Sequence, residues 1–504
     1  MLTRLNVRGF KNLTDVDIRF GPFTCIAGAN GVGKSNLFDA IRFLSALADK
    51  TLMEAASCVR DEEGRATDVR GLFFRAAGQN PSPMFFEVEM IVPEEGLDDL
   101  GQKAKATITF LRYALQLGYR NGKNPGGGGN LELLKEELVH INIGDAAKHL
   151  LFPHRASKWA KAVVKGSRRN NAPFISTTGR DKDRKIRLHQ DGRKGRPLDR
   201  LAETLPRTVL SATNAAENPT AFLARREMRL WQFLQLEPSA LRAPDEFSAP
   251  ARLGPNGSHL PATVYRLASH AHDAHPGQDS LQHQARVYQQ MANRLAALID
   301  DVHELKIDRD ERRELLTLTV SGRDGIAYPA RALSDGTLRF LALAVLAQDP
   351  EAQGLLCLEE PENGIHPERI PAMIELLKDI AVDPSEPPGP DNPLRQIIIN
   401  THSPEVVQQV PDDGLLVAEW HEAKWGEDVV RGVQFSCLPD TWRAKEKDKP
   451  APICSKGKLL AYLNPVLRRE PGEGPRDRKG RKQSKRVVDR DDIQPLLPGM
   501  GAGA

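Results

Sequence analysis

A short stretch near the N-terminus carries the residue types needed to bind a phosphate-containing ligand. GANGVGKS at 28–35 places Gly28 and Gly33 just before Lys34 and Ser35. Glycines let backbone N–H groups approach phosphate oxygens, the lysine adds a cation that reaches the β- and γ-phosphates, and the serine hydroxyl can ligate Mg²⁺. An apolar strand-like run precedes this stretch and a helical pattern follows it. The sequence therefore predicts a phosphate-binding loop between a strand and a helix.

Two later apolar runs end in residues that could act on a bound nucleotide. GLLCLEEPENGIHP at 354–367 ends its apolar part in Glu359 and Glu360. At such a strand end one carboxylate can approach Mg²⁺ and the next can activate water, so we assign Glu359 to the metal and Glu360 to the general base. IIINTHSPEVV at 397–407 ends its strand in His402. Sheets of α/β proteins bind ligands at strand ends, and we expect His402 to contact the γ-phosphate.

A third motif, LSDGT at 333–337, lies about three hundred residues after the phosphate-binding loop. It opens a helical pattern, so Ser334 and the first N–H groups of the helix can donate to an anion. Together the motifs resemble ATP-binding-cassette ATPases, and more closely the RecF-like and OLD-like AAA family ATPases, relatives of the chromosome-structural-maintenance (SMC) heads. The resemblance is carried by FKNL at 10–13, GANGVGKSN at 28–36, LSDGT at 333–337, LCLEEPENGIHP at 356–367 and NTHSP at 400–404.

The resemblance implies a fold and a mode of action. The fold would be α/β: an ATPase head with a P-loop core on a mixed sheet, an antiparallel β lobe and a basic, partly helical insertion. ATP with Mg²⁺ would lie between two chains, in a homodimer or a higher oligomer built from such dimers. One chain would supply the phosphate loop, and Ser334 and Gly336 would come from the other. The expected phosphate-loop contacts are Asn30, Gly31, Gly33, Lys34, Ser35 and Asn36.

The chain departs from the family pattern at two positions. Asp335 stands where the first signature glycine is usual, and Glu359 replaces the usual Asp before the catalytic Glu. The family also has a glutamine beside the metal after the first helix. Gln79 is the nearest candidate, and an exposed turn glutamine is the alternative reading. Asn363 and His366 follow the catalytic Glu and would lie near the dimer interface.

Composition limits the location of the chain. The longest strongly apolar run, FLALAVLA at 340–347, has about eight residues, too few to span a bilayer. The N-terminal segment has no apolar core of a signal peptide. Five cysteines are scattered without a CxxC pair, which argues against a disulfide framework or a zinc site. We therefore expect a cytoplasmic protein with no membrane contact.

Positive charge is concentrated in two segments, although the formal net charge is only +3. Residues 155–200 hold 15 Lys and Arg against 4 Asp and Glu, and residues 468–490 hold 10 against 4. Such a balance suits a nucleic-acid backbone. The segment 155–200 is thus either a nucleic-acid contact or a solvated insertion, since it offers few aromatic residues for base stacking.

The pattern predicts four regions. These are an N-terminal ATPase lobe at 1–141, a basic and helical insertion at 142–305, a C-terminal ATPase lobe at 306–440 and an extension at 441–504, disordered from about 466. Within the insertion, 142–200 is expected to form loops or a mobile elaboration, and helices are expected at 219–236 and 280–305.

Two functional interpretations remain. The first is an ATP-dependent switch in phage defence or DNA repair that acts through a separate effector protein. The second is an OLD-like nuclease acting by itself. The latter needs a further α/β domain after His402, and only about a hundred residues follow it. DRDD at 489–492 lies in the basic tail without a preceding apolar strand. A transporter subunit and a long coiled-coil protein do not fit the basic, Pro-containing insertion.

Overall fold

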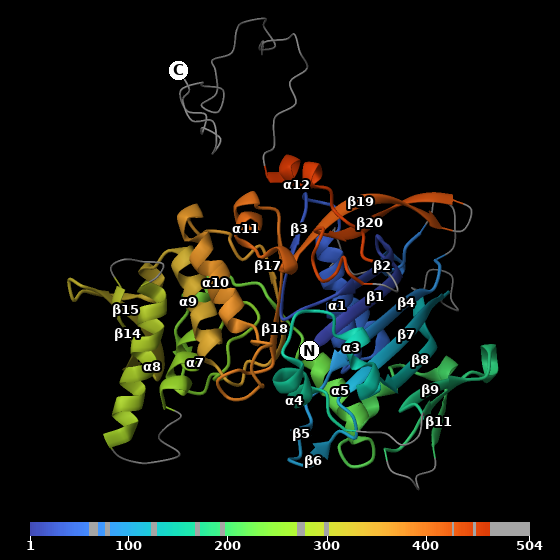
Figure 1. Ribbon diagram of the computed structural model, residues 1–504. Helices are drawn as coiled ribbons and strands as arrows, with labels where there is room; N and C mark the ends of the chain where they lie inside the picture. Colours follow the sequence, from blue (N-terminus) through green and yellow to red (C-terminus); the bar gives the residue numbers. More distant parts are fainter. Residues whose placement is uncertain are drawn as a thin grey trace, which may run out of the picture.

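Two large β-sheets and a smaller one organise the computed structural model (Figure 1). No helix in the described part of the chain is long and apolar enough to cross a membrane. The structure describes residues 1–59, 69–75, 81–121, 129–166, 172–191, 197–269, 278–296, 302–425, 428–446 and 450–463.

The largest sheet has eight strands, and each neighbouring pair is antiparallel. A hairpin of the first two strands forms one edge of it. In the order β11-β10-β9-β8-β7-β4-β1-β2, the strands are β11 (Leu198–Leu201), β10 (Lys185–Leu188), β9 (Ile175–Thr178), β8 (Asn130–His140), β7 (Phe110–Arg120), β4 (Met84–Ile91), β1 (Leu2–Phe10) and β2 (Leu13–Arg19).

The second sheet has six strands and carries the motifs. Its first five strands run parallel, and the last pairs antiparallel. Strands of a parallel sheet are covered on both faces, which explains their continuous apolar runs. In the order β12-β17-β18-β3-β19-β20, they are β12 (Gln232–Leu234), β17 (Gly354–Glu359), β18 (Arg395–Thr401), β3 (Phe23–Ala27), β19 (Leu415–Trp425) and β20 (Asp428–Cys437).

Alternate residues of these strands face two separate cores, as the two-residue period of a strand requires. Ile26 and Ile398 pack with α1 (Lys34–Leu47) and the eight-stranded sheet. Cys25 and Ile399 pack on the opposite side, with α7, α8, α9 and α10. The predicted fold, an ATPase head with a mixed sheet and an antiparallel lobe, is confirmed.

The remaining elements surround these cores. The third sheet contains β13 (Asp245–Glu246), β15 (Leu315–Gly322), β14 (Val302–Asp310) and β16 (Ala327–Pro329). A two-stranded ribbon pairs β5 (Glu95–Leu97) with β6 (Lys103–Lys105). The other helices are α2 (Leu52–Ser57), α3 (Ala146–His149), α4 (Lys161–Val163), α5 (Pro219–Arg229), α6 (Pro238–Leu241), α7 (Leu260–Ser269), α8 (Gln278–Ala296), α9 (Asp335–Gln348), α10 (Ile370–Ile380), α11 (Pro404–Gln409) and α12 (Lys456–Leu463).

Three expectations for the predicted insertion were wrong. The basic segment is not only loops, because β9, β10 and β11 continue the eight-stranded sheet past residue 141. The helix expected at 219–236 ends at Arg229, and β12 follows, because an open edge of β17 is available for parallel pairing. The helix expected at 280–305 does not reach 305, because α8 is described over Gln278–Ala296 and Val302 already begins β14, which pairs with β15. The tail beyond 463, predicted to be disordered from about 466, lies outside the described residues.

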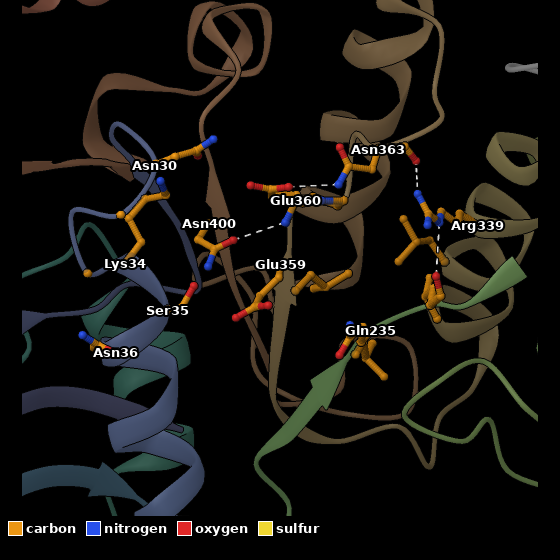
Figure 2. Close-up of a pocket in the computed structure, with 17 residues that line it drawn as sticks. Asn30, Lys34, Ser35, Asn36, Gln235, Arg339, Glu359, Glu360, Asn363 and Asn400 are labelled. Atoms are coloured by element: carbon orange, nitrogen blue, oxygen red, sulfur yellow. Dashed lines mark hydrogen bonds between the residues drawn. The ribbon is translucent and has the colours of Figure 1, made fainter. Parts of the chain in front are cut away.

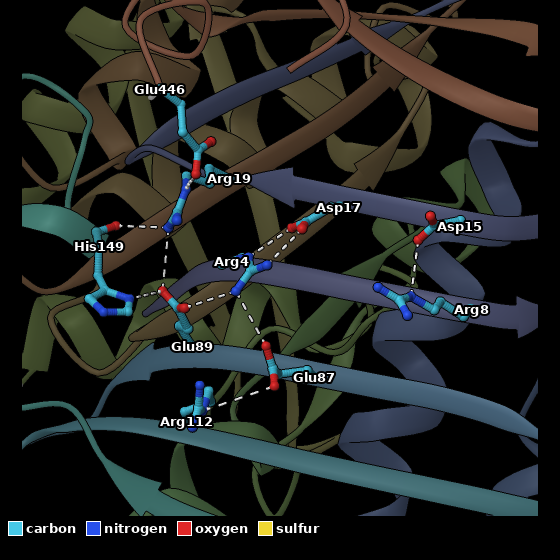
Figure 3. A network of polar contacts seen from close by, with 10 residues as sticks. All are labelled: Arg4, Arg8, Asp15, Asp17, Arg19, Glu87, Glu89, Arg112, His149 and Glu446. Carbon is cyan, nitrogen blue, oxygen red and sulfur yellow. Dashed lines mark hydrogen bonds and ion pairs between the residues drawn. The ribbon is translucent and has the colours of Figure 1, made fainter. Parts of the chain in front are cut away.

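A network of charges crosses the outer strands of the eight-stranded sheet (Figure 3). Glu89 on β4 is 1% exposed at its side chain and lies between Arg4, Arg19 and His149, at 3.1, 3.4 and 2.9 Å. Burial raises the pKa of Glu89, but His149, Arg19 and Arg4 together hold this pKa below its usual value. Arg19 also pairs with Glu446 at 2.7 Å, so the network joins the sheet to the segment after β20.

Replacing Glu89 with Gln should lower the free energy of unfolding by about 3 kcal/mol at pH 7, because the surrounding cations lose a buried partner. Since the folded pKa of Glu89 is depressed, its contribution is complete above the unfolded value and disappears as pH falls through the folded one. Urea unfolding followed by circular dichroism at several pH values measures this. The matched control is Asp15→Asn, which breaks an exposed pair with Arg8 and should cost less than about 1 kcal/mol. Equal losses in both variants would contradict the assignment.

Candidate active site

The motifs meet because three parallel strands end at the same edge of the six-stranded sheet. In the strand pairing, Glu359 lies opposite Asn400, and Thr401 lies opposite Ala27. The phosphate loop, the acidic pair and the histidine therefore follow neighbouring strand ends. A cavity of about 490 Å³ opens at this edge (Figure 2), within the roughly 300–1,000 Å³ typical of small-molecule sites.

The phosphate loop has a backbone that only glycine accommodates easily. Gly33 has φ 110°, and a Cβ there would lie 2.2 Å from the Asn12 amide nitrogen. Asn12 in turn donates to the Val32 carbonyl at 3.0 Å and accepts from Asn36 at 2.8 Å. Asn12 belongs to the FKNL stretch, so the turn between β1 and β2 stabilises the phosphate loop through these hydrogen bonds.

Lys34 provides the cation of the loop. Its ammonium donates to the carbonyl oxygens of Gly28 and Ala29, at 2.7 and 2.9 Å. Burial lowers the pKa of Lys34, while Glu360 and Glu362 oppose this shift. Among the described residues Lys34 has no carboxylate within salt-bridge distance. A buried cation held only by neutral carbonyls beside a glycine cradle fits a phosphate group.

Glu360 is held in a strained turn just after β17. Its φ is 46°, an uncommon value for a non-glycine residue, and its N–H donates to the backbone oxygen of Asn400 at 3.0 Å. Its Oε1 lies 2.7 Å from His402 Nδ1, and its Oε2 accepts from Asn363 at 3.0 Å. Burial raises the pKa of Glu360, but Asn363, His402 and Lys34 outweigh burial and keep it below the usual value. The carboxylate is thus ionised at neutral pH and can accept a proton.

The cavity gathers most of the residues predicted for the site. Ser35 and Glu359 both line it, on the phosphate-loop and β17 sides respectively (Figure 2). His402 reaches the site through its contact with Glu360 rather than by lining the cavity. The predicted residues that line it are Asn30, Gly31, Gly33, Lys34, Ser35, Asn36, Glu359 and Glu360.

Gln235 was missed in the sequence. It follows β12 directly and lines the cavity near Glu359 (Figure 2). The signal is a glutamine after the short apolar run WQFL, but this run lies inside the helix predicted at 219–236. Gln79, the predicted metal-side glutamine, lies outside the described residues.

The signature motif sits at the N-terminus of α9. Ser334 caps this helix, and its hydroxyl accepts from the Thr337 N–H at 3.2 Å. Asp335, the residue in the usual glycine position, pairs with Arg242. A Cβ on Gly336 would lie 2.3 Å from the carbonyl oxygen of Gly364, so α9 packs closely on the loop after Glu360.

Two residues of α9, Arg339 and Leu343, line the cavity. Arg339 donates to the carbonyls of Asn363 and Leu236. Ser334 and Gly336 are not among the described residues that line this cavity. Arg339 therefore links α9 to the cavity, although Ser334 and Gly336 at the N-terminus of this helix do not line it.

Family comparisons agree with this geometry. Residues 165–408 match a model described as an AAA domain, putative AbiEii toxin of a type IV toxin–antitoxin system. Residues 4–52, which include the phosphate loop, match a second AAA domain model. Over both segments the chain is therefore similar to AAA domains. The two matched segments together contain every motif described above.

Individual curated proteins match the chain over short stretches. The DNA replication and repair protein RecF of Phocaeicola vulgatus is 31% identical over 106 residues, 21% of this chain and 25% of the relative. RecF of Magnetococcus marinus is 51% identical over 45 residues, 9% of this chain and 12% of the relative. The chain thus spans a quarter or less of the length of these curated relatives.

Solved SMC heads resemble the chain over a longer span but at low identity. An SmcHead bound to the C-winged helix domain of ScpA gives a TM-score of 0.44 at 13% identity, covering 87% of this chain and 98% of that one. The SMC head domain from Thermotoga maritima gives 0.35 at 12% identity, covering 86% and 97%. The fold assignment rests on the strand order and on the site.

Replacing Lys34 with Ala should weaken ATP binding at least about 100-fold, because the phosphates lose the one cation of the loop. Titration with a fluorescent ATP analogue measures the dissociation constant. The matched control is Lys306→Ala on β14, an exposed lysine paired with Glu304, and should bind like the wild type. Unchanged affinity in Lys34→Ala would remove the phosphate-loop assignment.

Proposed function

We propose that this chain binds ATP with Mg²⁺ and hydrolyses it, with Glu360 as the general base. The observation that supports this most is the position of the Glu360 carboxylate. It faces the cavity that Lys34 and the phosphate loop line, and its position is held by His402 and Asn363. A base of this kind must be deprotonated and within reach of the water it activates.

The other residues divide between phosphates and metal. Lys34 and the N–H groups of residues 30–36 bind the phosphates, and His402 contacts the γ-phosphate. Ser35 and Glu359 hold Mg²⁺, and we add Gln235 on the metal side because it shares their cavity. The bound ion neutralises phosphate charge and orients the triphosphate. Gln79 stays a prediction for the same role.

The signature motif supports an ATP-dependent dimer. Ser334 and Gly336 at the N-terminus of α9 do not line the cavity of their own chain, and this end of the helix is the positive end of its dipole. We propose that these residues complete the site of a second copy, so that ATP closes a homodimer or a larger assembly of such dimers and hydrolysis reopens it.

The proposed role is a switch in a DNA-related process with a separate effector protein. The name of the RecF relatives favours repair, and the toxin–antitoxin description of the matched model favours phage defence. The alternative, an OLD-like nuclease acting by itself, needs a second metal centre. The described residues contain no group of three or more His, Cys, Asp or Glu side chains placed to hold a metal ion.

Fewer cations of the basic segment are available for nucleic-acid contact than its composition indicates. Lys158, Lys165 and Arg187 pair with acidic residues at 2.6–2.7 Å. These cations are partly neutralised within the chain. We propose that nucleic acid meets the remaining cations on and beside β9–β11, which have no ion pair with other described residues: Arg180, Lys182, Lys185 and Arg200.

Replacing Glu360 with Gln should leave ATP binding intact and reduce kcat about 10²- to 10⁴-fold, because an amide accepts no proton from water. The ATP-bound variant should accumulate as a dimer, which light scattering after size-exclusion chromatography detects. Glu368→Gln, a matched change at an exposed position of the following turn, should retain turnover. A monomeric Glu360→Gln that still hydrolyses ATP would reject both the base and the dimer.

Replacing Arg180, Lys182, Lys185 and Arg200 with Gln should weaken DNA and RNA binding and reduce its salt dependence, because fewer counterions are released. The matched control replaces the paired Lys165 and Arg187 with Gln. Salt-independent or absent binding by the wild type would show that the segment is a solvated insertion.

With Mg²⁺ or Mn²⁺ and ATP, plasmid, linear and single-stranded substrates should remain intact. Cutting that persists in Lys34→Ala would favour the nuclease alternative.

A further inference from the structure

A buried carboxyl group lies directly behind the proposed general base. Glu362 is two residues after Glu360 and is only 8% exposed. Its Oε1 accepts a short hydrogen bond from the hydroxyl of Thr401. Its Oε2 is buried and has no hydrogen-bond partner among the described residues. Burying a carboxyl oxygen without a partner destabilises the fold, which points to a role for Glu362 other than general stability.

The partner of Glu362 fixes the residue next to it. Thr401 ends β18, where it pairs with Ala27, and His402 follows. The Thr401 oxygen that donates to Glu362 also accepts from the N–H of Ser403 at 2.9 Å. The backbone is therefore held on both sides of His402, and the direction of the imidazole depends on the Thr401 hydroxyl.

Two other contacts join the same loops. One links the Glu360 N–H to Asn400, and the other links the side chains of Glu360 and His402. The second lies between side chains that are 32% and 42% exposed, where water competes for both groups. The Glu362–Thr401 bond is out of contact with water. It can keep the loops in register when Glu360 and His402 engage other partners.

We propose that Glu362 is a positioning residue for ATP hydrolysis, and that it acts through Thr401 to hold His402 against Glu360. This inference rests on the proposed function of the site. It assigns Glu362 no contact with ATP or metal. Its effect should therefore be on turnover and depend on His402, while ATP affinity stays near that of the wild type.

The surroundings of Glu362 indicate which substitution preserves its role. The charged and titratable groups around it are Glu360, His402, Lys34 of α1, Cys25 of β3 and Tyr462 of α12. Burial first, and the nearby Glu360 as well, raise the pKa of Glu362. A neutral amide of the same shape can still accept from Thr401. Glu362→Gln is thus the conservative variant.

The experiment measures kcat and ATP affinity separately. Glu362→Ala and Thr401→Val should each lower kcat about 10- to 100-fold, as the loss of a supporting hydrogen bond at a catalytic site does. The ATP dissociation constant should stay within about threefold, because no phosphate contact is removed. Glu362→Gln should restore most of the kcat that Glu362→Ala loses. Glu368→Ala is the exposed control on the same loop.

A double-mutant cycle tests the route through His402. In a His402→Ala background, Glu362→Ala should cause no further loss, because the residue that it positions is gone. Circular dichroism and thermal unfolding check that each variant is folded, and Thr401→Val replaces Glu362→Ala in the cycle if the latter does not fold. An undiminished effect in the His402→Ala background, a change in affinity alone, or full activity of Glu362→Ala would overturn the proposal.

Failure of this inference is distinguishable from failure of the proposed function. If the wild type hydrolyses ATP and Glu360→Gln does not, the site is confirmed, and a silent Glu362→Ala rejects only the positioning role. If the wild type and Glu360→Gln behave alike, the proposed function fails and the positioning role falls with it.

Discussion

The parallel pairing of β3, β18 and β17 is the constraint on which the site depends. It joins residues 23–27, 395–401 and 354–359 by backbone hydrogen bonds and brings three distant loops to one sheet edge. A shift of one residue between β17 and β18 would turn Glu360 away from the Asn400 backbone oxygen that holds its turn. The alternating apolar residues of these strands enter two cores, so such a shift would also disrupt both.

The order of the strands explains why the site could be foreseen from the sequence only in part. The phosphate loop, Glu359, Glu360 and His402 each follow a long apolar run, and such runs in an α/β protein predict neighbouring strand ends. Gln235 follows β12, which has three residues and forms only because β17 offers an open edge. No local pattern marks such a strand, since its stability comes from a partner more than a hundred residues away.

The basic segment was misjudged for a related reason. β9, β10 and β11 are short and carry charged residues, so their alternation is weak. They are strands because β8 provides a template to extend, and β11 is exposed along its whole length. Ion pairs such as Lys158 with Glu386 and Lys165 with Glu94 join segments far apart in sequence. A count of charges cannot reveal them, and it overstates the positive field of the segment.

The charge balance of the cavity supports the proposal that two chains complete the ATP site. Lys34 and Arg339 are the cations among its described lining residues, and Glu359 and Glu360 are the anions. The formal charges of these four cancel, yet a triphosphate brings several negative charges beside two carboxylates. Mg²⁺ can offset part of this repulsion. The rest calls for further positively polarised groups, and the N-terminus of α9 is of that kind, although Ser334 and Gly336 do not line the cavity of their own chain. Arg339 joins α9 to the backbone of Asn363, and the Asn363 side chain donates to Glu360. A contact between α9 and a phosphate of a second chain would therefore also act on the general base of its own chain.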